Sequence, residues 1–498
     1  MPIGYLVTTA LMAAVALSAV SRHRPRRSSP FRLCYVFGLV LNWPLVAFVL
    51  LVASTALAVA QSGVGSPVFW IGLGFAVLAS AGLGVLRQRA QGTSPALERA
   101  LDEGLGAGWR DGVDADLAAR LGRRPSLARI LFAPISFRRH GVERLANIRY
   151  GPARRGNLLD LYRDHAKRPA RATLIYLHAG AFRFGSKRLG ARHLLYRLAS
   201  QGWVCVSANY RLLSAGLADP LIDVKKVIAW VREHGREYGL DPNAVFLAGS
   251  SAGGHLASLA AFTPKDPLFQ PGFEGADTSV AGVITLYGYY GPVGSAQPPS
   301  SRLAYSTAKA PPCFVVHGDQ DTLVIVEDAQ GFVEQLRATS TNPVIYAELP
   351  GAQHGFDLFR SRRFDTVVDA IEAFTAHIRS RHRTAGGGID DSFGEGLPAR
   401  LRGPGHGERR VAGSGCHRDW AGHGGAGTSY LVLGGPSCVS GCWLGETACE
   451  DMVNSDGGQT ESAVRTRLGL DLLVSHDLCA GLSAHMPRGE IQVPGGWG

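Results

Sequence analysis

The chain begins with three uncharged apolar stretches and changes its pattern after them. The stretches cover residues 4–20, 34–60 and 68–86. A helix needs about 20 apolar residues to cross the hydrocarbon core of a bilayer, and in lipid its backbone groups must bond internally. We therefore expect a membrane region over residues 1–88 with three transmembrane helices. A cleaved signal peptide is the alternative for the first stretch, but its basic residues follow the apolar run instead of preceding it.

Basic residues between the stretches predict the orientation in the membrane. The segment 21–33 contains Arg22, Arg24, Arg26, Arg27 and Arg32, whereas the segment 61–67 contains no charge. Positively charged loops stay in the cytoplasm. The sequence therefore predicts a multi-pass protein of the cell membrane whose chain after about residue 87 faces the cytosol.

Amphipathic segments follow the apolar stretches. Residues 89–145 show helical spacing of apolar and charged positions, and we expect a helical connector there. From residue 146 to residue 383, short apolar strands alternate with amphipathic helices, of which 224–238 and 364–379 are examples. The expected strands lie at 158–162, 173–178, 204–208, 245–248, 280–286, 314–317 and 344–349. This alternation predicts an α/β domain with a mostly parallel central sheet covered by helices on both faces.

The last segment, residues 384–498, has a different composition. It contains 26 glycines, no lysine and no sustained helical or strand period. Cys416, Cys438 and Cys442 lack the spacing of a zinc site, so a disordered low-complexity tail is the favoured interpretation. The abrupt change in composition also raises the hypothesis of out-of-frame readthrough, which a DNA sequence around codon 385 would test.

Charge excludes one class of function. The formal net charge is +11, but residues 1–86 carry five arginines and no acid, residues 87–383 a balance of +11, and the tail a balance of −5. No single basic field results, and no nucleic-acid-binding motif accompanies the charge. We expect no nucleic-acid partner, no metal and no cofactor.

One motif predicts a nucleophile. Gly249-Ser250-Ser251-Ala252-Gly253 follows the apolar strand VFLA and precedes the apolar helix HLASLAAF. This is G-x-S-x-G in its strand–turn–helix context, where small flanking residues permit a sharp turn that exposes the middle serine. We therefore predict Ser251 as a nucleophile, with Gly249 and Gly253 supporting the turn.

Three further strand ends carry suitable chemistry. His178-Ala179-Gly180-Ala181 can bring backbone N–H groups close to a substrate carbonyl, although a plain turn is an equal alternative. An acid that orients a histidine is expected after the strand ending at His317, and Asp321 is preferred over Asp319. His354, in a glycine-flanked loop after the strand 344–349, is the predicted general base.

The order Ser251, Asp321, His354 is the chain order of the α/β-hydrolase triad. Residues 146–383 resemble an α/β-hydrolase of the hormone-sensitive-lipase-like carboxylesterase group, and in particular the membrane-anchored actinobacterial Lip esterases. The matching segments are 158–163, 178–182, 209–212, 249–254, 317–324 and 351–357.

The resemblance implies a role for each site residue. It implies Ser251 as nucleophile, His354 as general base and acid, and Asp321 as its partner, with oxyanion donors at the N–H groups of Gly180, Ala181 and Ala252. The family's His-Gly-Gly-Gly reads His178-Ala179-Gly180-Ala181 here, and alanine disfavours positive φ. The acidic, proline-rich cap signature that often follows Tyr-Arg-Leu in the family is missing.

These features together predict a membrane-anchored serine carboxylesterase that cleaves a small-molecule or lipid ester through an acyl-enzyme. The same triad also serves acyltransferases, thioesterases and peptidases, so these remain alternatives. A non-catalytic membrane-bound binding module is a second alternative, but a binder has no need for all three groups in order. Transport is not supported, because the three apolar stretches carry no ionisable residue.

Overall fold

The computed structural model describes residues 2–20, 44–62, 65–113, 115–119, 130, 138–166, 170–212, 217–293 and 307–385. Of the tail predicted over 384–498, residues 386–498 lie outside the described residues. Residues 34–43 of the second apolar stretch and the arginine-containing segment 21–33 also lie outside them.

Three long apolar helices come first: α1 (Pro2–Val20), α3 (Pro44–Ser62) and α4 (Pro67–Gln91). Each is long and apolar enough to cross a membrane. Small residues let α1 and α4 approach closely, because a side chain at Gly72 would meet the Tyr5 ring and one at Gly82 would meet Ala16. The guanidinium of Arg89, near the end of α4, donates to the carbonyls of Ala19 (3.1 Å) and Val20 (2.6 Å) and so caps the end of α1.

The segment expected as a connector contributes to the core of the α/β domain. Helix α5 (Thr93–Leu105) follows α4 directly, and the short helices η2 (Ala107–Gly112) and α6 (Ala115–Ala118) come after it. Leu97, Ala100 and Leu101 are buried in the same hydrophobic cluster as Ile345 of the sheet. A side chain at Gly104 would collide with Ile345, so the helix lies directly on that strand. An amphipathic pattern predicts such a helix but not the surface that its apolar side contacts.

The sheet has eight strands in the order β1-β2-β4-β3-β5-β6-β7-β8. In this order, neighbouring strands are parallel from β4 through to β8, whereas the pairs β1–β2 and β2–β4 are antiparallel. The mostly parallel sheet is thus confirmed, and an edge strand that the pattern did not predict is added to it. The strands are β1 (Val142–Arg149), β2 (Leu158–Asp164), β3 (Thr173–Leu177), β4 (Val204–Ala208), β5 (Val245–Ser250), β6 (Gly282–Leu286), β7 (Cys313–Gly318) and β8 (Val344–Leu349).

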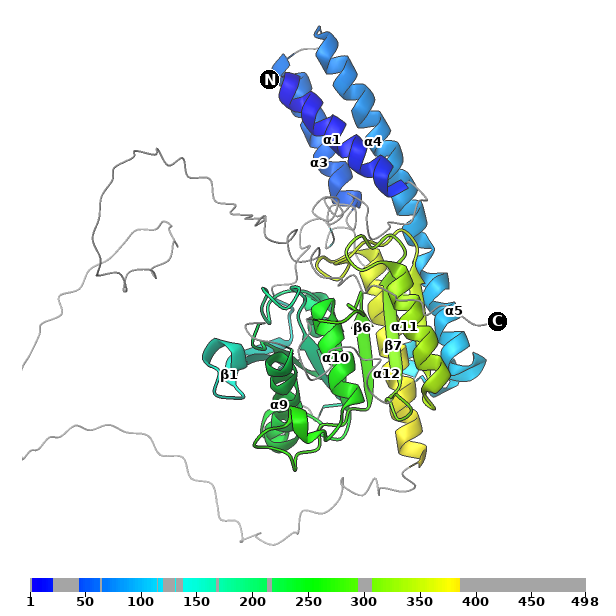
Figure 1. Cartoon of the computed structure of the whole chain (residues 1–498). Coiled ribbons are helices and arrows are strands. Elements are labelled where there is room, and N and C mark those ends of the chain that lie inside the picture. Colours follow the sequence, from blue (N-terminus) through cyan, green and yellow to red (C-terminus); the bar gives the residue numbers. More distant parts are fainter. Residues whose placement is uncertain are drawn as a thin grey trace, which may run out of the picture. The chain divides into compact units, whose positions relative to one another are not determined.

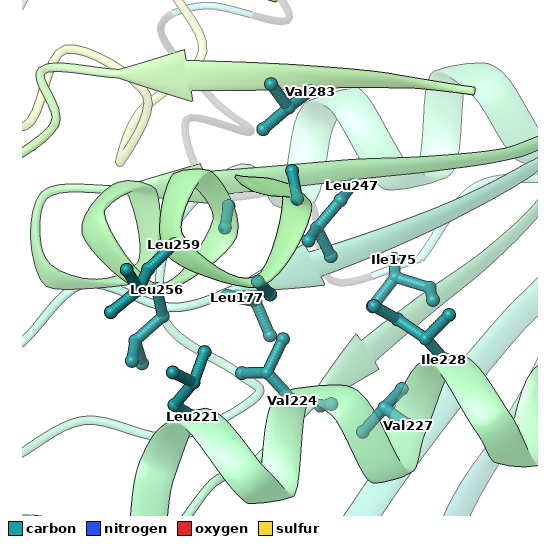
Figure 2. Close-up of a cluster of buried hydrophobic side chains, with 14 of the residues drawn as sticks. Ile175, Leu177, Leu221, Val224, Val227, Ile228, Leu247, Leu256, Leu259 and Val283 are labelled. Atoms are coloured by element: carbon teal, nitrogen blue, oxygen red, sulfur yellow. The ribbon is translucent and has the colours of Figure 1, made fainter. Parts of the chain in front are cut away.

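Helices cover both faces of the sheet (Figure 1). One face packs on α9 (Ala218–His234), α10 (Ala252–Phe262) and α11 (Val326–Thr339), and the other on α8 (Arg192–Ala199), α12 (Arg362–Ala385) and α5. Along β3, Ile175 and Leu177 face the first group while Leu174 and Tyr176 face the second, as the two-residue period of a strand requires. Figure 2 shows Ile175 and Leu247 meeting the side chains of α9 and α10.

Truncating a buried side chain of α5 tests whether this helix stabilises the α/β domain. Leu101 is 2% exposed, so Leu101→Ala is expected to lower the free energy of unfolding by about 2–5 kcal/mol. Arg99→Ala, on the exposed side of the same helix, is expected to change it by less than about 0.5 kcal/mol. Urea-induced loss of esterase activity in detergent measures both, and equal midpoints for the two variants would show that α5 is not part of the core.

Candidate active site

The turn after β5 presents Ser251. The φ of Ser251 is 53° and its ψ is −117°. Residues other than glycine rarely adopt this conformation, which turns the chain sharply from β5 into α10. The flanking glycines are needed because a Cβ at Gly249 would collide with the Gly253 carbonyl and one at Gly253 with the Leu177 carbonyl. The predicted turn is therefore present, and Ser251 keeps 9% of its surface exposed.

A chain of hydrogen bonds runs from this serine to a buried carboxylate. Nε2 of His354 lies 2.9 Å from the Ser251 hydroxyl oxygen, and Nδ1 of His354 lies 2.7 Å from Oδ2 of Asp321. The other oxygen of Asp321 accepts the N–H groups of Leu323 and Val324, both at 2.9 Å. The loops after β5, β7 and β8 thus bring together the three residues that the sequence ordered as nucleophile, acid and base.

Asp319, the competing acid, lies elsewhere in the same loop. Its Oδ1 accepts the N–H of Gly351 at 2.6 Å, and burial raises the pKa of this carboxyl group. It therefore ties the loop after β7 to the loop after β8, while Asp321 alone of the two contacts the His354 ring.

The loop after β3 carries the residues predicted as oxyanion donors. Gly180 has a φ of 139°, and Ala181 follows at 49°. Ala252 is the first residue of α10, so its N–H belongs to the four that a helix leaves without an internal acceptor.

His178 supports this loop and does not reach the triad. Its ring stacks on Tyr210 with centroids 4.3 Å apart, and its Nδ1 lies 2.7 Å from the Ala179 carbonyl. Burial lowers the pKa of His178 to about 4, so its imidazole is neutral at physiological pH.

Substituting glycine for the strained alanine gives a stability prediction. A side-chain-bearing residue in the left-handed region costs about 1–2 kcal/mol, and glycine loses part of this gain through its greater freedom in the unfolded chain. Ala181→Gly is therefore expected to raise the free energy of unfolding by about 0.5–1 kcal/mol while keeping the N–H in place. Thermal inactivation of the esterase measures the shift, and a less stable variant would contradict the strain at this position.

Four further residues surround the predicted triad and were not assigned a role from the sequence. The side-chain oxygen of Gln353 accepts the N–H groups of Thr322 (2.8 Å) and His354 (3.1 Å). His317 is buried, with Nε2 2.8 Å from the Val324 carbonyl, and burial lowers its pKa. The ring of Tyr287 lies 4.5 Å from that of His354.

The fourth residue, Asp357, is 1% exposed and binds the Tyr287 hydroxyl. The feature of the sequence that points to Asp357 is its position three residues after His354.

In the described part of the chain, no group of three or more His, Cys, Asp or Glu residues gathers as a metal site would require.

The chain is similar in sequence to several known proteins. A family model described as BD-FAE matches residues 159–294. The "Probable carboxylic ester hydrolase LipM" of Mycobacterium tuberculosis is 36% identical over 412 residues, which cover 76% of this chain and 93% of LipM. "Esterase LipQ" of the same organism is 35% identical over 327 residues, covering 59% of this chain and 77% of LipQ. The solved structure of Thermogutta terrifontis esterase 2 phosphoramylated by tabun matches with a TM-score of 0.40 at 25% identity, over 50% of this chain and 96% of that one.

The sheet order and the serine turn define an α/β-hydrolase, as the sequence predicted. Within that class, the chain belongs to the family of mycobacterial Lip carboxylic ester hydrolases, as its similarity to LipM over most of both chains shows. It is a carboxylic ester hydrolase, and its substrate is an ester.

Proposed function

We propose that the protein is a membrane-anchored serine carboxylesterase that works through the triad Ser251, His354 and Asp321. The observation that carries this proposal is the hydrogen-bond chain from the Ser251 hydroxyl through both ring nitrogens of His354 to Asp321. A nucleophile, a base and an orienting acid within hydrogen-bond reach of one another are the arrangement that acyl transfer through serine needs.

The geometry supports a two-step mechanism. Nε2 of His354 takes the hydroxyl proton as the Ser251 oxygen bonds to the ester carbonyl carbon, and the backbone N–H groups of Gly180, Ala181 and Ala252 receive the oxyanion. The imidazolium, held by Asp321, returns the proton to the leaving alcohol as the ester C–O bond breaks. Water then attacks the acyl carbon and gives a proton to His354. His354 passes this proton to the Ser251 oxygen as the bond between that oxygen and the acyl group breaks and the carboxylic acid is released.

Covalent labelling tests the proposed nucleophile. A fluorophosphonate probe is expected to label the full-length protein once, and fragmentation of the labelled peptide should place the added mass on Ser251. The neighbouring Ser250 is an internal control, because its hydroxyl donates to Asp357 at 2.7 Å and is fully buried. Label on Ser250, or no label on an active esterase, would overturn the assignment.

Anchoring of this enzyme in the membrane by its N-terminal helices is the second part of the proposal. Its support is the length and apolar composition of α1, α3 and α4, together with the arginines between residues 21 and 33. In this arrangement the turn between α3 and α4 is outside the cell, and α5 and the α/β domain face the cytosol.

Labelling of engineered cysteines tests the anchoring and its orientation. In intact cells, a membrane-impermeant maleimide is expected to label Ser66→Cys, at the start of α4. The matched variant Arg99→Cys, on α5, should react only after the membrane is permeabilised, and the natural chain gives the background of its own cysteines. The opposite pattern would reverse the orientation, and release of the protein by an alkaline carbonate wash would exclude the anchor.

A further inference from the structure

A buried carboxylate lies directly beside the proposed triad and has no part in it. Asp357 is 1% exposed, and its two oxygens bind three hydroxyl groups that come from three strand ends. Ser250 donates to Oδ2 at 2.7 Å, the Tyr176 hydroxyl lies 3.2 Å from the same oxygen, and Tyr287 donates to Oδ1. We call this group, Asp357 with Ser250, Tyr176 and Tyr287, the carboxylate cage.

The cage is closed on a further side by main chain. Gly190 has a φ of 78°, and a side chain there would collide with the Tyr176 hydroxyl and approach Oδ2 of Asp357 at 3.1 Å. A buried carboxylate needs such donors, because an ion without hydrogen bonds is strongly disfavoured in a low-dielectric interior. Burial, and to a lesser extent the charge of Asp357, raises the pKa of both tyrosines, so their hydroxyls keep the protons that they donate.

Two members of the cage lead directly to the triad. Ser250 immediately precedes Ser251, so its hydrogen bond to Asp357 fixes the peptide that enters the strained turn. The Tyr287 ring packs on the His354 ring with centroids 4.5 Å apart, and its backbone N–H is held by the Val316 carbonyl at 2.8 Å. Movement of the carboxylate therefore changes the surroundings of both the nucleophile and the base.

We propose that Asp357 is a positioning residue for the esterase reaction: its carboxylate holds Ser250 and Tyr287 in place, and its negative charge favours the His354 imidazolium that forms when Ser251 loses its proton. This inference rests on the proposed function, since it assumes that His354 is the base. Asp357 stays out of contact with the substrate in this role and acts through its neighbours.

The charge around His354 determines the expected sign of the pH effect. Asp321 contacts the ring at 2.7 Å, and Asp357, whose pKa burial raises, interacts with it electrostatically. In the ionised form both carboxylates favour the protonated ring. His317, whose pKa burial lowers, and the protonated Tyr287 face the same ring without adding negative charge. Removing the charge of Asp357 should therefore disfavour the His354 imidazolium, and the acidic limb of activity should move to lower pH.

The test is Asp357→Asn in the full-length protein, with p-nitrophenyl butyrate as the substrate between pH 4 and pH 9. We expect kcat to fall about 10-fold to 100-fold with KM nearly unchanged, because small displacements of reacting groups have effects of this size. We also expect the acidic limb of the pH profile of kcat/KM to move to lower pH by about one unit. A merely structural carboxylate would change the thermal stability and leave that limb where it is.

Tyr287→Phe is the matched control, because it removes one donor and keeps both the ring on His354 and the negative charge. It should lower kcat by less than Asp357→Asn and leave the acidic limb in place. The proposal would be overturned by an unchanged kcat in Asp357→Asn, or by acidic limbs that lie at the same pH in the two variants.

If Asp357→Asn does not fold, Ser250→Ala and Tyr287→Phe replace it. Each removes one hydroxyl from the cage, so kcat should fall in both at constant KM, and unchanged kcat in both would refute the role of the cage. A natural chain that hydrolyses esters without reacting with a fluorophosphonate would instead refute the proposed triad, which separates the two failures.

Discussion

Replacing Ser251 by alanine is expected to lower kcat for p-nitrophenyl butyrate by about 10⁴-fold to 10⁶-fold. The variant loses the oxygen that is proposed to bond to the acyl group, while the N–H of Ala252 and the other proposed oxyanion donors remain. Steady-state kinetics of the detergent-solubilised protein, with active-site titration of the natural chain, measures the loss.

Ser258→Ala is the matched control for this experiment. Ser258 is a buried serine of α10 whose hydroxyl donates to the Gly254 carbonyl within its own helix at 2.9 Å, so its removal should leave the activity within a few fold. A Ser251→Ala protein that keeps more than about 1% of the natural turnover would show that another group performs the acyl transfer.

The second large effect separates the two acids of one loop. Asp321→Asn is expected to lower kcat by about 10⁴-fold, because an amide beside Nδ1 of His354 favours the wrong tautomer and no longer stabilises the imidazolium. Asp319→Asn should stay within about 10-fold of the natural chain, since an amide oxygen can still accept the Gly351 N–H.

The comparison of these two variants is decisive because the substitutions are identical and the residues are two positions apart. Both should be measured at several pH values, so that a shifted optimum is not mistaken for a lost activity. A greater loss in Asp319→Asn than in Asp321→Asn would reverse the assignment of the acid.

The triad could be proposed from the sequence because each of its members stands at the end of an apolar strand. Parallel strands place their carboxyl ends on one edge of the sheet, which is why residues 251, 321 and 354 can meet there. The glycines around Ser251 gave the sharpest signal, since the turn admits no side chain at Gly249 or Gly253.

Other features depend on contacts that no local pattern contains. The edge strand β1 is charged and only partly buried, so it lacks the apolar run that revealed the other strands. The carboxylate cage joins side chains that lie up to 181 positions apart, and its tyrosines look like ordinary core residues in the sequence. The positive φ of Ala181 places an alanine in the left-handed region, a conformation that this residue type disfavours and that the sequence therefore does not predict.

Helix α5 has a consequence for how this enzyme can be shortened or recombined. Its apolar side chains share one hydrophobic cluster with Ile345 and Phe374, although α5 follows the apolar helix α4 with a single residue between them. A chain that starts at β1 would expose this cluster to water, so a soluble version of the enzyme has to begin no later than Thr93. For the same reason, the N-terminal helices are not an exchangeable module: a hybrid protein would need its junction between Gln91 and Thr93, at Gly92, to keep the catalytic core intact.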